Sequence, residues 1–188
     1  MKKIVLAIAA FTSLAGSAFA QQAYVGAAVG QSHFNVDCSG TTSCKDNDTG
    51  YKLFGGYKFT PNLAGELTYF DYGKVTAGVP LSATTSATVK IRGTGVGLGV
   101  AFMADFAPPW SGVGRLGVVS NRAKVSVVSG TFSGSDSESK TTAYAGVGVS
   151  YAINPQMKLD AALDFSNLEY AGEKSNVRLL SVGLTYAF

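Results

Sequence analysis

Leu180-Ser181-Val182-Gly183-Leu184-Thr185-Tyr186-Ala187-Phe188 is the stretch that decides the fold. It alternates without a break between large apolar residues and small or polar ones, and it finishes on an aromatic residue. Successive side chains of a β-strand point to opposite faces. The stretch therefore predicts a strand with one bulky apolar face and one small, polar face. Such a strand is typical of a barrel wall that has lipid on its outside.

The N-terminus carries the pattern of a secretory signal. Lys2 and Lys3 precede an apolar stretch over residues 4–14, and Ser17-Ala18-Phe19-Ala20 ends in an A-x-A cleavage site. We therefore expect residues 1–20 to be a signal peptide and residues 21–188 to form the mature domain. An uncleaved membrane anchor is the disfavoured alternative, because the apolar stretch is too short to span a bilayer.

The apolar residues of the mature chain are spread over short runs. Hydrophobic residues make up 46% of the sequence, yet no mature segment approaches the roughly 18 continuous apolar residues of a spanning helix. A membrane protein without such helices must be a closed β-barrel, because backbone groups in lipid have to be paired within the protein. The formal net charge of +3 falls to +1 without Lys2 and Lys3, so no nucleic acid partner is expected.

Turn residues and alternation divide the mature chain into eight strands. We predict an all-β fold, an eight-stranded antiparallel transmembrane up-and-down barrel, with strands near 22–34, 50–59, 63–72, 88–103, 111–124, 141–153, 157–166 and 177–188. Three short turns alternate with four long polar loops near 35–49, 73–87, 125–140 and 167–176, which is the rhythm of transmembrane barrels. A soluble sandwich or a lipocalin-like barrel would also alternate along its strands, but its loops would not follow this rhythm.

Several segments resemble the OmpA-type transmembrane domain of bacterial outer membranes. They are Gly50-Tyr51-Lys52-Leu53-Phe54-Gly55-Gly56-Tyr57-Lys58-Phe59, Pro61-Asn62, Glu66-Leu67-Thr68-Tyr69-Phe70-Asp71-Tyr72-Gly73, Gly114-Arg115-Leu116-Gly117 and residues 145–155. The C-terminal stretch also resembles the insertion signal of such barrels, so Phe188 is expected to bind the barrel-assembly machinery. The resemblance implies a Gram-negative outer-membrane location. The family's best-known members carry a peptidoglycan-binding domain after the barrel, whereas this sequence stops at Phe188, so we expect no cell-wall anchoring.

Strand parity places seven charged side chains in the lumen of the predicted barrel: Lys52, Lys58, Glu66, Arg115, Lys158, Asp160 and Asp164. An eight-stranded barrel is only wide enough for its own side chains, so these charges must pair. We expect Arg115 to pair with Glu66 or Asp160, because a guanidinium can fork to a carboxylate. The resemblance also implies an acid at Ser150 and a base at Asp160, so the family's network must be rewired here. A packed polar plug is favoured over a gated conduit for small ions.

Four basic residues lie at the outer ends of the predicted fourth and fifth strands: Lys90, Arg92, Arg122 and Lys124. They share the parity of lipid-facing positions on neighbouring strands, so they should form one patch above the apolar band. Basic groups at this height predict contacts with outer-membrane lipid, namely the phosphates of lipopolysaccharide. Ordinary snorkelling of long side chains is the alternative.

Cys38 and Cys44 are the only cysteines, and both lie in a polar stretch of an exported chain. This context predicts a disulfide that closes a small loop. A metal site is the alternative, but two thiols without a nearby histidine pair make a poor zinc site. We therefore expect no metal and no cofactor.

The sequence gives little support to an enzyme. His33 is the only histidine, and it follows Ser32 in a strand, so the two side chains face opposite sides and cannot pair directly. The G-x-G-x-x-G match at residues 112–117 lies within a strand and is no dinucleotide site. A lipid-modifying enzyme is only a minor alternative.

The sequence therefore predicts a structural and surface-interaction protein, and we expect a monomer. Its outer loops, such as residues 129–139, are rich in Ser, Gly and Asp and are expected to engage a host or surface ligand, although they carry no recognition motif. A narrow passive pore is the second hypothesis.

Overall fold

The computed structural model describes residues 22–35, 43–82, 85–129, 132–170 and 173–188. These residues form nine strands: β1 (Ala23–Phe34), β2 (Ser43–Lys45), β3 (Asn47–Thr60), β4 (Leu63–Ser82), β5 (Thr85–Ala107), β6 (Trp110–Ser129), β7 (Phe132–Ala152), β8 (Met157–Tyr170) and β9 (Glu173–Ala187). In the part of the chain that is described, no helix is long and apolar enough to cross a membrane.

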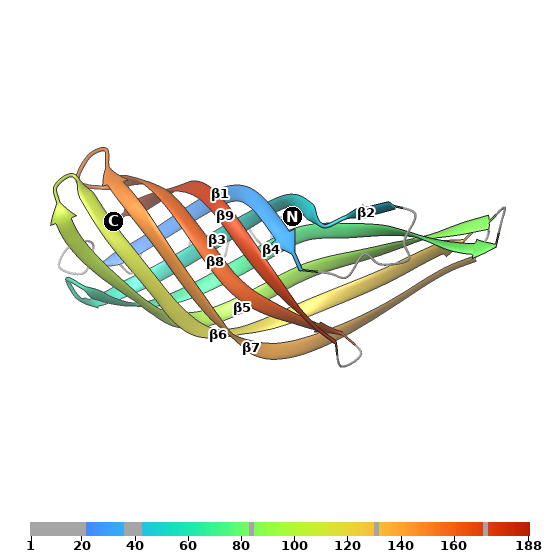
Figure 1. Cartoon of the computed structure of the whole chain (residues 1–188). Coiled ribbons are helices and arrows are strands. Elements are labelled where there is room, and N and C mark those ends of the chain that lie inside the picture. The colour runs from blue at the N-terminus through green and yellow to red at the C-terminus, as the bar shows by residue number, and fades with distance from the viewer. Residues whose placement is uncertain (1–21, 36–42, 83–84, 130–131, 171–172) are drawn as a thin grey trace, which may run out of the picture.

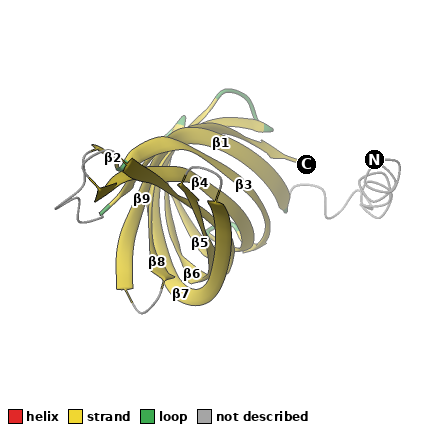
Figure 2. Cartoon of the chain, turned by 90° about the vertical axis from the view of Figure 1, so that its right-hand side faces the viewer, coloured by secondary structure: helices red, strands yellow, loops and turns green. Residues whose placement is uncertain are grey.

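Eight of these strands close into a ring. Neighbours are antiparallel in the order β4-β3-β1-β9-β8-β7-β6-β5, and pairing of β4 with β5 completes the circle, which Figure 2 shows from one end. The short strand β2 pairs with β4 beyond the ring, from Ser43 opposite Gly78 to Lys45 opposite Thr76. The predicted eight-stranded antiparallel barrel is confirmed.

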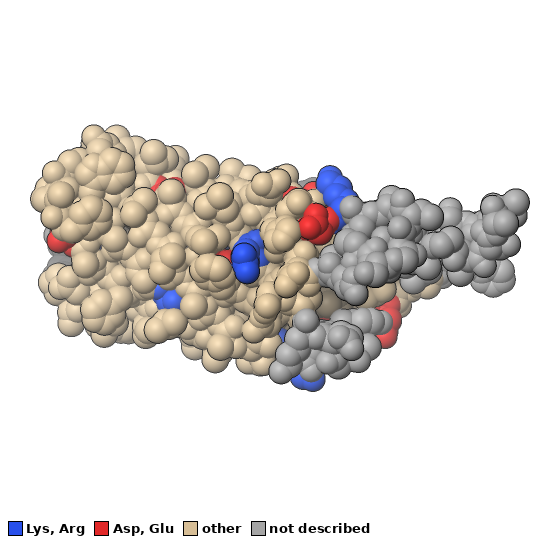
Figure 3. Space-filling model, viewed as in Figure 1, with Lys and Arg blue, Asp and Glu red and all other residues tan. Residues whose placement is uncertain are grey.

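The alternating C-terminal stretch forms strand β9, which has one exposed apolar face and one buried face. On β9 the side chains of Leu180, Val182 and Leu184 are 61%, 58% and 46% exposed, whereas Ser181 is 2% exposed. The other ring strands expose apolar side chains in the same way, and charged side chains are sparse over the wall in Figure 3. An apolar belt of this extent is not stable in water, so the outside of the wall faces lipid.

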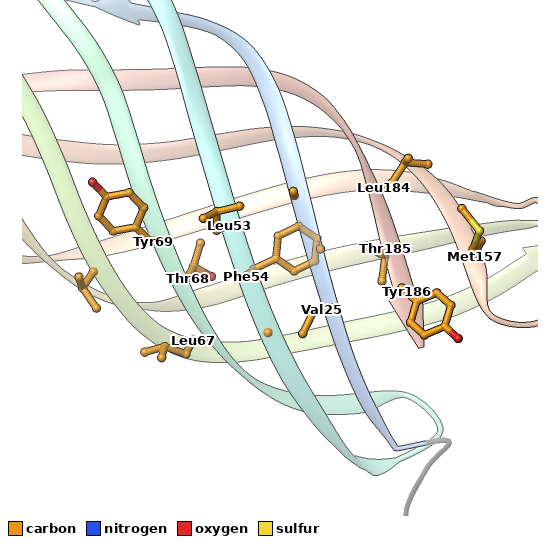
Figure 4. Close-up of a pocket in the computed structure, with 14 residues that line it drawn as sticks. Val25, Leu53, Phe54, Leu67, Thr68, Tyr69, Met157, Leu184, Thr185 and Tyr186 are labelled. Carbon is orange, nitrogen blue, oxygen red and sulfur yellow. The ribbon is translucent and has the colours of Figure 1, made fainter. Parts of the chain in front are cut away.

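The lipid-facing surface of the wall contains a groove where the outward-facing residues are small. Ala27 and Gly55 line a shallow apolar groove of about 780 Å³ on the lipid face, between larger side chains of β3, β4 and β9 such as Leu53, Leu67 and Leu184 (Figure 4). Because the groove faces lipid, we treat it as part of the membrane-embedded wall.

At one end of the barrel, which we call the inner end, the strands are joined by the three short turns that the sequence predicts. They lie between β3 and β4, between β5 and β6, and between β7 and β8. In the last of these turns, Asn154 Oδ1 accepts hydrogen bonds from the backbone N–H groups of Gln156 and Met157, at 2.9 and 2.7 Å. Aromatic pairs surround this end: Trp110 with Tyr151, Tyr57 with Phe59, and Tyr186 with Phe188. Such a girdle is typical of a membrane interface.

At the outer end the strands run further than predicted. The β4–β5 and β6–β7 hairpins extend to Ser82/Thr85 and Ser129/Phe132 and project well beyond the ring (Figure 1), and β8–β9 extends to Tyr170/Glu173. The prediction of long polar loops outside the strands at 73–87, 125–140 and 167–176 was therefore wrong for most of these residues. Pairing continues along these extensions, with register shifts on β4 between Asp71 and Gly73 and between Pro80 and Ser82. In water both faces of a strand can be polar, so a loop-like composition does not exclude a strand.

Candidate functional site: the charged lumen and the basic outer rim

Four charged side chains meet inside the barrel, one each from β3, β4, β6 and β8. Lys52, Glu66, Arg115 and Asp164 are each 5% exposed or less. Arg115 Nε donates to Glu66 Oε1 at 2.8 Å, and Lys52 Nζ donates to Asp164 Oδ2 at 2.5 Å. Each charge therefore has a direct partner, as burial in a narrow, low-dielectric space requires.

Glu66 is the centre of this layer. Its Oε2 accepts a hydrogen bond from the Tyr24 hydroxyl at 3.0 Å, and its Oε1 accepts a second from Thr68 at 3.2 Å. Arg115 reaches the carboxylate through Nε alone, so the predicted two-pronged fork is replaced by a single bond. The three donors hold Glu66 in one orientation, because both of its oxygens are engaged.

The Phe54 ring lies against both cations of the layer. The Arg115 guanidinium carbon is 5.0 Å from the ring centroid, and Lys52 Nζ is 5.5 Å from it. A ring face attracts cations in this range. Sequence reasoning gave Phe54 no role, although its inward parity between Lys52 and Lys58 was a usable signal.

Asp160 lies apart from Arg115. Its oxygens accept hydrogen bonds from Ser150 Oγ and Thr185 Oγ1, both at 2.5 Å. Within the described residues it has no basic group within 4 Å. The family's acid and base positions are thus occupied here by a serine and an aspartate that bond to each other. Lys58 and Lys158 lie at the inner end of the lumen beside them.

The outer half of the lumen is lined mainly by apolar side chains, which the sequence analysis missed. Phe70 stacks on Tyr72 with a centroid distance of 5.4 Å and meets Tyr144 edge-on at 5.7 Å. We call this cluster the apolar seal. All of its members are 6% exposed or less: Phe34, Phe70, Tyr72, Val75, Val119, Tyr144, Leu168, Val177 and Leu179. An ion that passed this layer would lose most of its hydration and would meet few polar atoms, such as the Tyr72 and Tyr144 hydroxyls and Asn121 Oδ1.

Glycines on the inward face make room for large neighbours. A Cβ on Gly146 would lie 2.5 Å from Asp164 Oδ1, and one on Gly95 would lie 2.2 Å from Asn121 Oδ1. At Gly117 a Cβ would lie 2.4 Å from the Leu98 carbonyl oxygen and 2.6 Å from the Tyr144 ring. The glycines therefore make room for the apolar seal as well as for charged and polar side chains of the lumen.

The four basic residues predicted at the outer end lie together, and we call them the basic rim. Arg92 is directly opposite Lys124 in the β5–β6 register, Thr94 is opposite Arg122, and Lys90 is opposite Ser126. All four basic side chains are exposed. Arg92, Arg122 and Lys124 line a groove of about 620 Å³ together with Tyr69, Thr94 and the residues 135–137 of β7.

The partners of the basic rim leave part of its charge uncompensated. Arg92 bonds Asp71 Oδ2 at 2.5 Å, and this hydrogen bond with the carboxylate charge raises the pKa of Arg92 above its ordinary value. Arg122 donates to the Ser137 hydroxyl at 2.9 Å. Within the described residues Lys90 and Lys124 have no carboxylate within 4 Å, although Asp136 lines the same groove.

The remaining candidates have separate positions. His33 is half-exposed at the outer end and contacts Asn47 Oδ1 at 2.8 Å, while the buried Ser32 hydroxyl donates to the Tyr72 carbonyl on the opposite face. Cys44 belongs to β2, and Cys38 lies outside the described residues, so the disulfide stays a prediction. The described part of the chain contains no cluster of three or more metal-binding side chains.

The closed ring, the apolar belt and the charged interior together define a small β-barrel of the bacterial outer membrane. The chain belongs to the OmpA-like transmembrane domain family, whose sequence model matches residues 18–188. No curated protein matches the sequence.

Solved structures share the fold at low sequence identity. Ail, the attachment invasion locus protein of Yersinia pestis, is 20% identical with a TM-score of 0.55, and the match covers 88% of this chain and 99% of Ail. Neisserial surface protein A is 20% identical with a TM-score of 0.52, covering 88% and 97%. OprG from Pseudomonas aeruginosa is 15% identical with a TM-score of 0.57, covering 89% and 96%.

Proposed function

We propose that this barrel is a surface protein that binds the phosphates of lipopolysaccharide on its basic rim. The observation that carries the proposal is the cross-strand pair of Arg92 and Lys124, two like charges directly opposite each other. Like charges in this position repel each other. Asp71 compensates Arg92, whereas Lys124 has no carboxylate within 4 Å in the described part of the chain, so the pair keeps a positive charge that an anion would neutralise. Lipopolysaccharide phosphates supply that charge through strong, charge-assisted hydrogen bonds.

The height of the basic rim supports this ligand. Val96 is 52% exposed and belongs to the apolar belt, and Thr94 and Arg92 follow it toward the outer end on the same face of β5. The basic groups therefore lie where the hydrocarbon gives way to headgroups. Ail was crystallised with a heparin analogue, sucrose octasulfate. A sulfated polysaccharide is accordingly the second candidate ligand for the same groove.

The test is lipopolysaccharide retained per barrel after detergent extraction. We expect the quadruple variant K90Q/R92Q/R122Q/K124Q to retain several-fold less than the wild type, because hydrogen bonds to charged groups contribute about 1.5–3 kcal/mol each. The double variant K45Q/R178Q, which removes two exposed basic residues on β2 and β9 at the outer end, is the matched control. Equal retention in the quadruple variant would disprove the proposal. Displacement by sucrose octasulfate alone would favour the polysaccharide.

The other surface features complete the proposal. The projecting ends of β4, β5, β6 and β7, rather than irregular loops, present the surface that a host or environmental ligand would meet.

The barrel acts as a monomer, reaches the membrane through recognition of Phe188 by the assembly machinery, and performs no catalysis. The lumen is a closed plug, because two buried ion pairs and the apolar seal fill it in series.

A further inference from the structure

A small cavity at the inner end of the lumen, where the short turns typical of the periplasmic side lie, is lined by several cationic side chains. We call this cavity of about 70 Å³ the vestibule; it lies beside the inner turn, since Pro155 and Gln156 form part of its lining. One water needs about 10–15 Å³ of such space, so the vestibule has room for a few waters or one small oxyanion. Its polar lining includes Lys58, Ser111, Arg115, Ser150, Lys158 and Asp160.

Arg115 faces the vestibule with donors that the charged layer does not use. The side chain is 5% exposed, and only Nε bonds Glu66. Its two terminal nitrogens, Nη1 and Nη2, form no hydrogen bond with the described residues. They are not fully buried, so they are open to the vestibule. With Nε engaged, the Nη1–Nη2 edge of the guanidinium is free, and its two parallel N–H bonds match the geometry of an oxyanion.

Lys58 and Lys158 add two further positive charges. Lys158 Nζ is 3.5 Å from the buried Ser111 hydroxyl, and the two ammonium groups are close enough to repel each other. Neither has a carboxylate within 4 Å in the described part of the chain. Asp160 is engaged by Ser150 and Thr185, and Asp105, which attracts Lys58 from outside, is exposed.

The charge balance of the lumen points to one missing anion. Its seven charged side chains are four cations and three carboxylates. Two cations are satisfied by direct ion pairs, which leaves Lys58 and Lys158 with Asp160 inside the lumen and, for Lys58, with the exposed Asp105 outside it. The two half-buried ammonium groups repel each other, and a bound anion would neutralise the excess positive charge.

We propose that the vestibule binds a small oxyanion of the phosphate class between Arg115, Lys58, Lys158 and the Ser111 hydroxyl. The oxyanion comes either from free phosphate in the periplasm or from the headgroup of a phospholipid in the inner leaflet. Both sources present the same chemistry, and the experiment separates them.

The experiment titrates inorganic phosphate into the ¹⁵N-labelled barrel in octyl glucoside micelles, which contain no phosphate, at constant ionic strength. We expect a saturable shift of the Arg115 Nε–H signal and of the Ser111 and Ser150 amide signals. The K58M/K158M variant should bind at least about tenfold more weakly, because it loses two charged hydrogen-bond donors. K58R/K158R keeps the charges and should retain binding, which separates lost charge from misfolding.

The outer rim provides the matched control. K90M/K124M removes two lysines at the opposite end and should leave the vestibule titration unchanged, so failure here is distinguishable from failure of the lipopolysaccharide proposal. A shift that appears only in nanodiscs containing phosphatidylglycerol, and is lost in K58M/K158M, identifies the headgroup as the source. No saturable shift under either condition, or an equal shift in K58M/K158M, would overturn the proposal.

Discussion

The two halves of the lumen are filled by different chemistry. The half nearer the inner end contains ion pairs between residues of different strands, such as Lys52 of β3 with Asp164 of β8. The outer half contains stacked rings such as Phe70 and Tyr72. Ion pairs tolerate few geometries and therefore specify which strand residues face each other, whereas apolar side chains repack more freely and exclude water. The contrast indicates that the charged layer sets the register and the apolar seal closes the barrel.

The strongest test of this contrast is Arg115→Ala. The substitution leaves Glu66 buried without its cation, so we expect a loss of about 3–5 kcal/mol in the free energy of unfolding by urea in micelles. The double variant Arg115→Met/Glu66→Leu leaves no unpaired charge from this pair and should lose clearly less. A loss below about 1 kcal/mol in Arg115→Ala would show that the pair does not support the barrel.

Phe70→Ala tests the other half of the lumen. It removes a fully buried ring, and we expect a loss of about 3 kcal/mol in the free energy of unfolding.

In planar bilayers the wild type and Arg115→Ala should both show no conductance, because the apolar seal remains. The double variant Arg115→Ala/Phe70→Ala should show discrete openings. Stable openings in Arg115→Ala alone would assign closure to the charged layer and favour the pore hypothesis.

Gly117→Val tests how tightly the wall encloses the apolar seal. The new Cβ would meet the Leu98 carbonyl on the neighbouring strand, so β5 and β6 must shift and we expect a loss of about 1–3 kcal/mol. Gly114→Ala on the same strand is the control, since nothing lies within 4 Å of its added Cβ. Equal unfolding free energies for the two variants would contradict this account.

The smallest expected effect is at the water-exposed edge above the apolar seal. Burial alone would raise the pKa of Asp48, but hydrogen bonds from the backbone N–H groups of Lys74 and Thr49, with the nearby lysine charges, together lower it below its ordinary value. A lowered folded-state pKa stabilises the fold above the unfolded-state pKa of about 4, and this contribution is lost as pH falls through the folded-state pKa. The protection factor of the Lys74 amide, which corrects the exchange rate for its intrinsic pH dependence, should therefore fall on acidification below about pH 4. Asp48→Asn should abolish this pH dependence.

The barrel wall was predictable because the type of each residue, large and apolar or small and polar, indicates which face of the strand its side chain occupies. Leu180 and Ser181 differ in type as they differ in environment, so parity identified the strands, the lipid face and the inward position of Glu66 and Arg115. The apolar seal was not predictable in the same way. Phe70, Tyr144 and Leu168 come from three different strands, and parity says which way a side chain points but not at which height it meets the others. The outer strand extensions were missed because residues 133–139 have the composition of a loop.

The projecting hairpins have a consequence for how the surface of such a protein can evolve. Side chains repeat every two residues along a strand, so adding or deleting two residues in each strand of the β6–β7 hairpin keeps every inward side chain inward. Each such step changes the reach of the hairpin by roughly 7 Å and leaves the register at Arg115 and Gly146 untouched. A single-residue insertion would instead invert the faces beyond it. The distance between the membrane and the exposed tip can therefore vary among relatives in discrete steps while the barrel below stays the same.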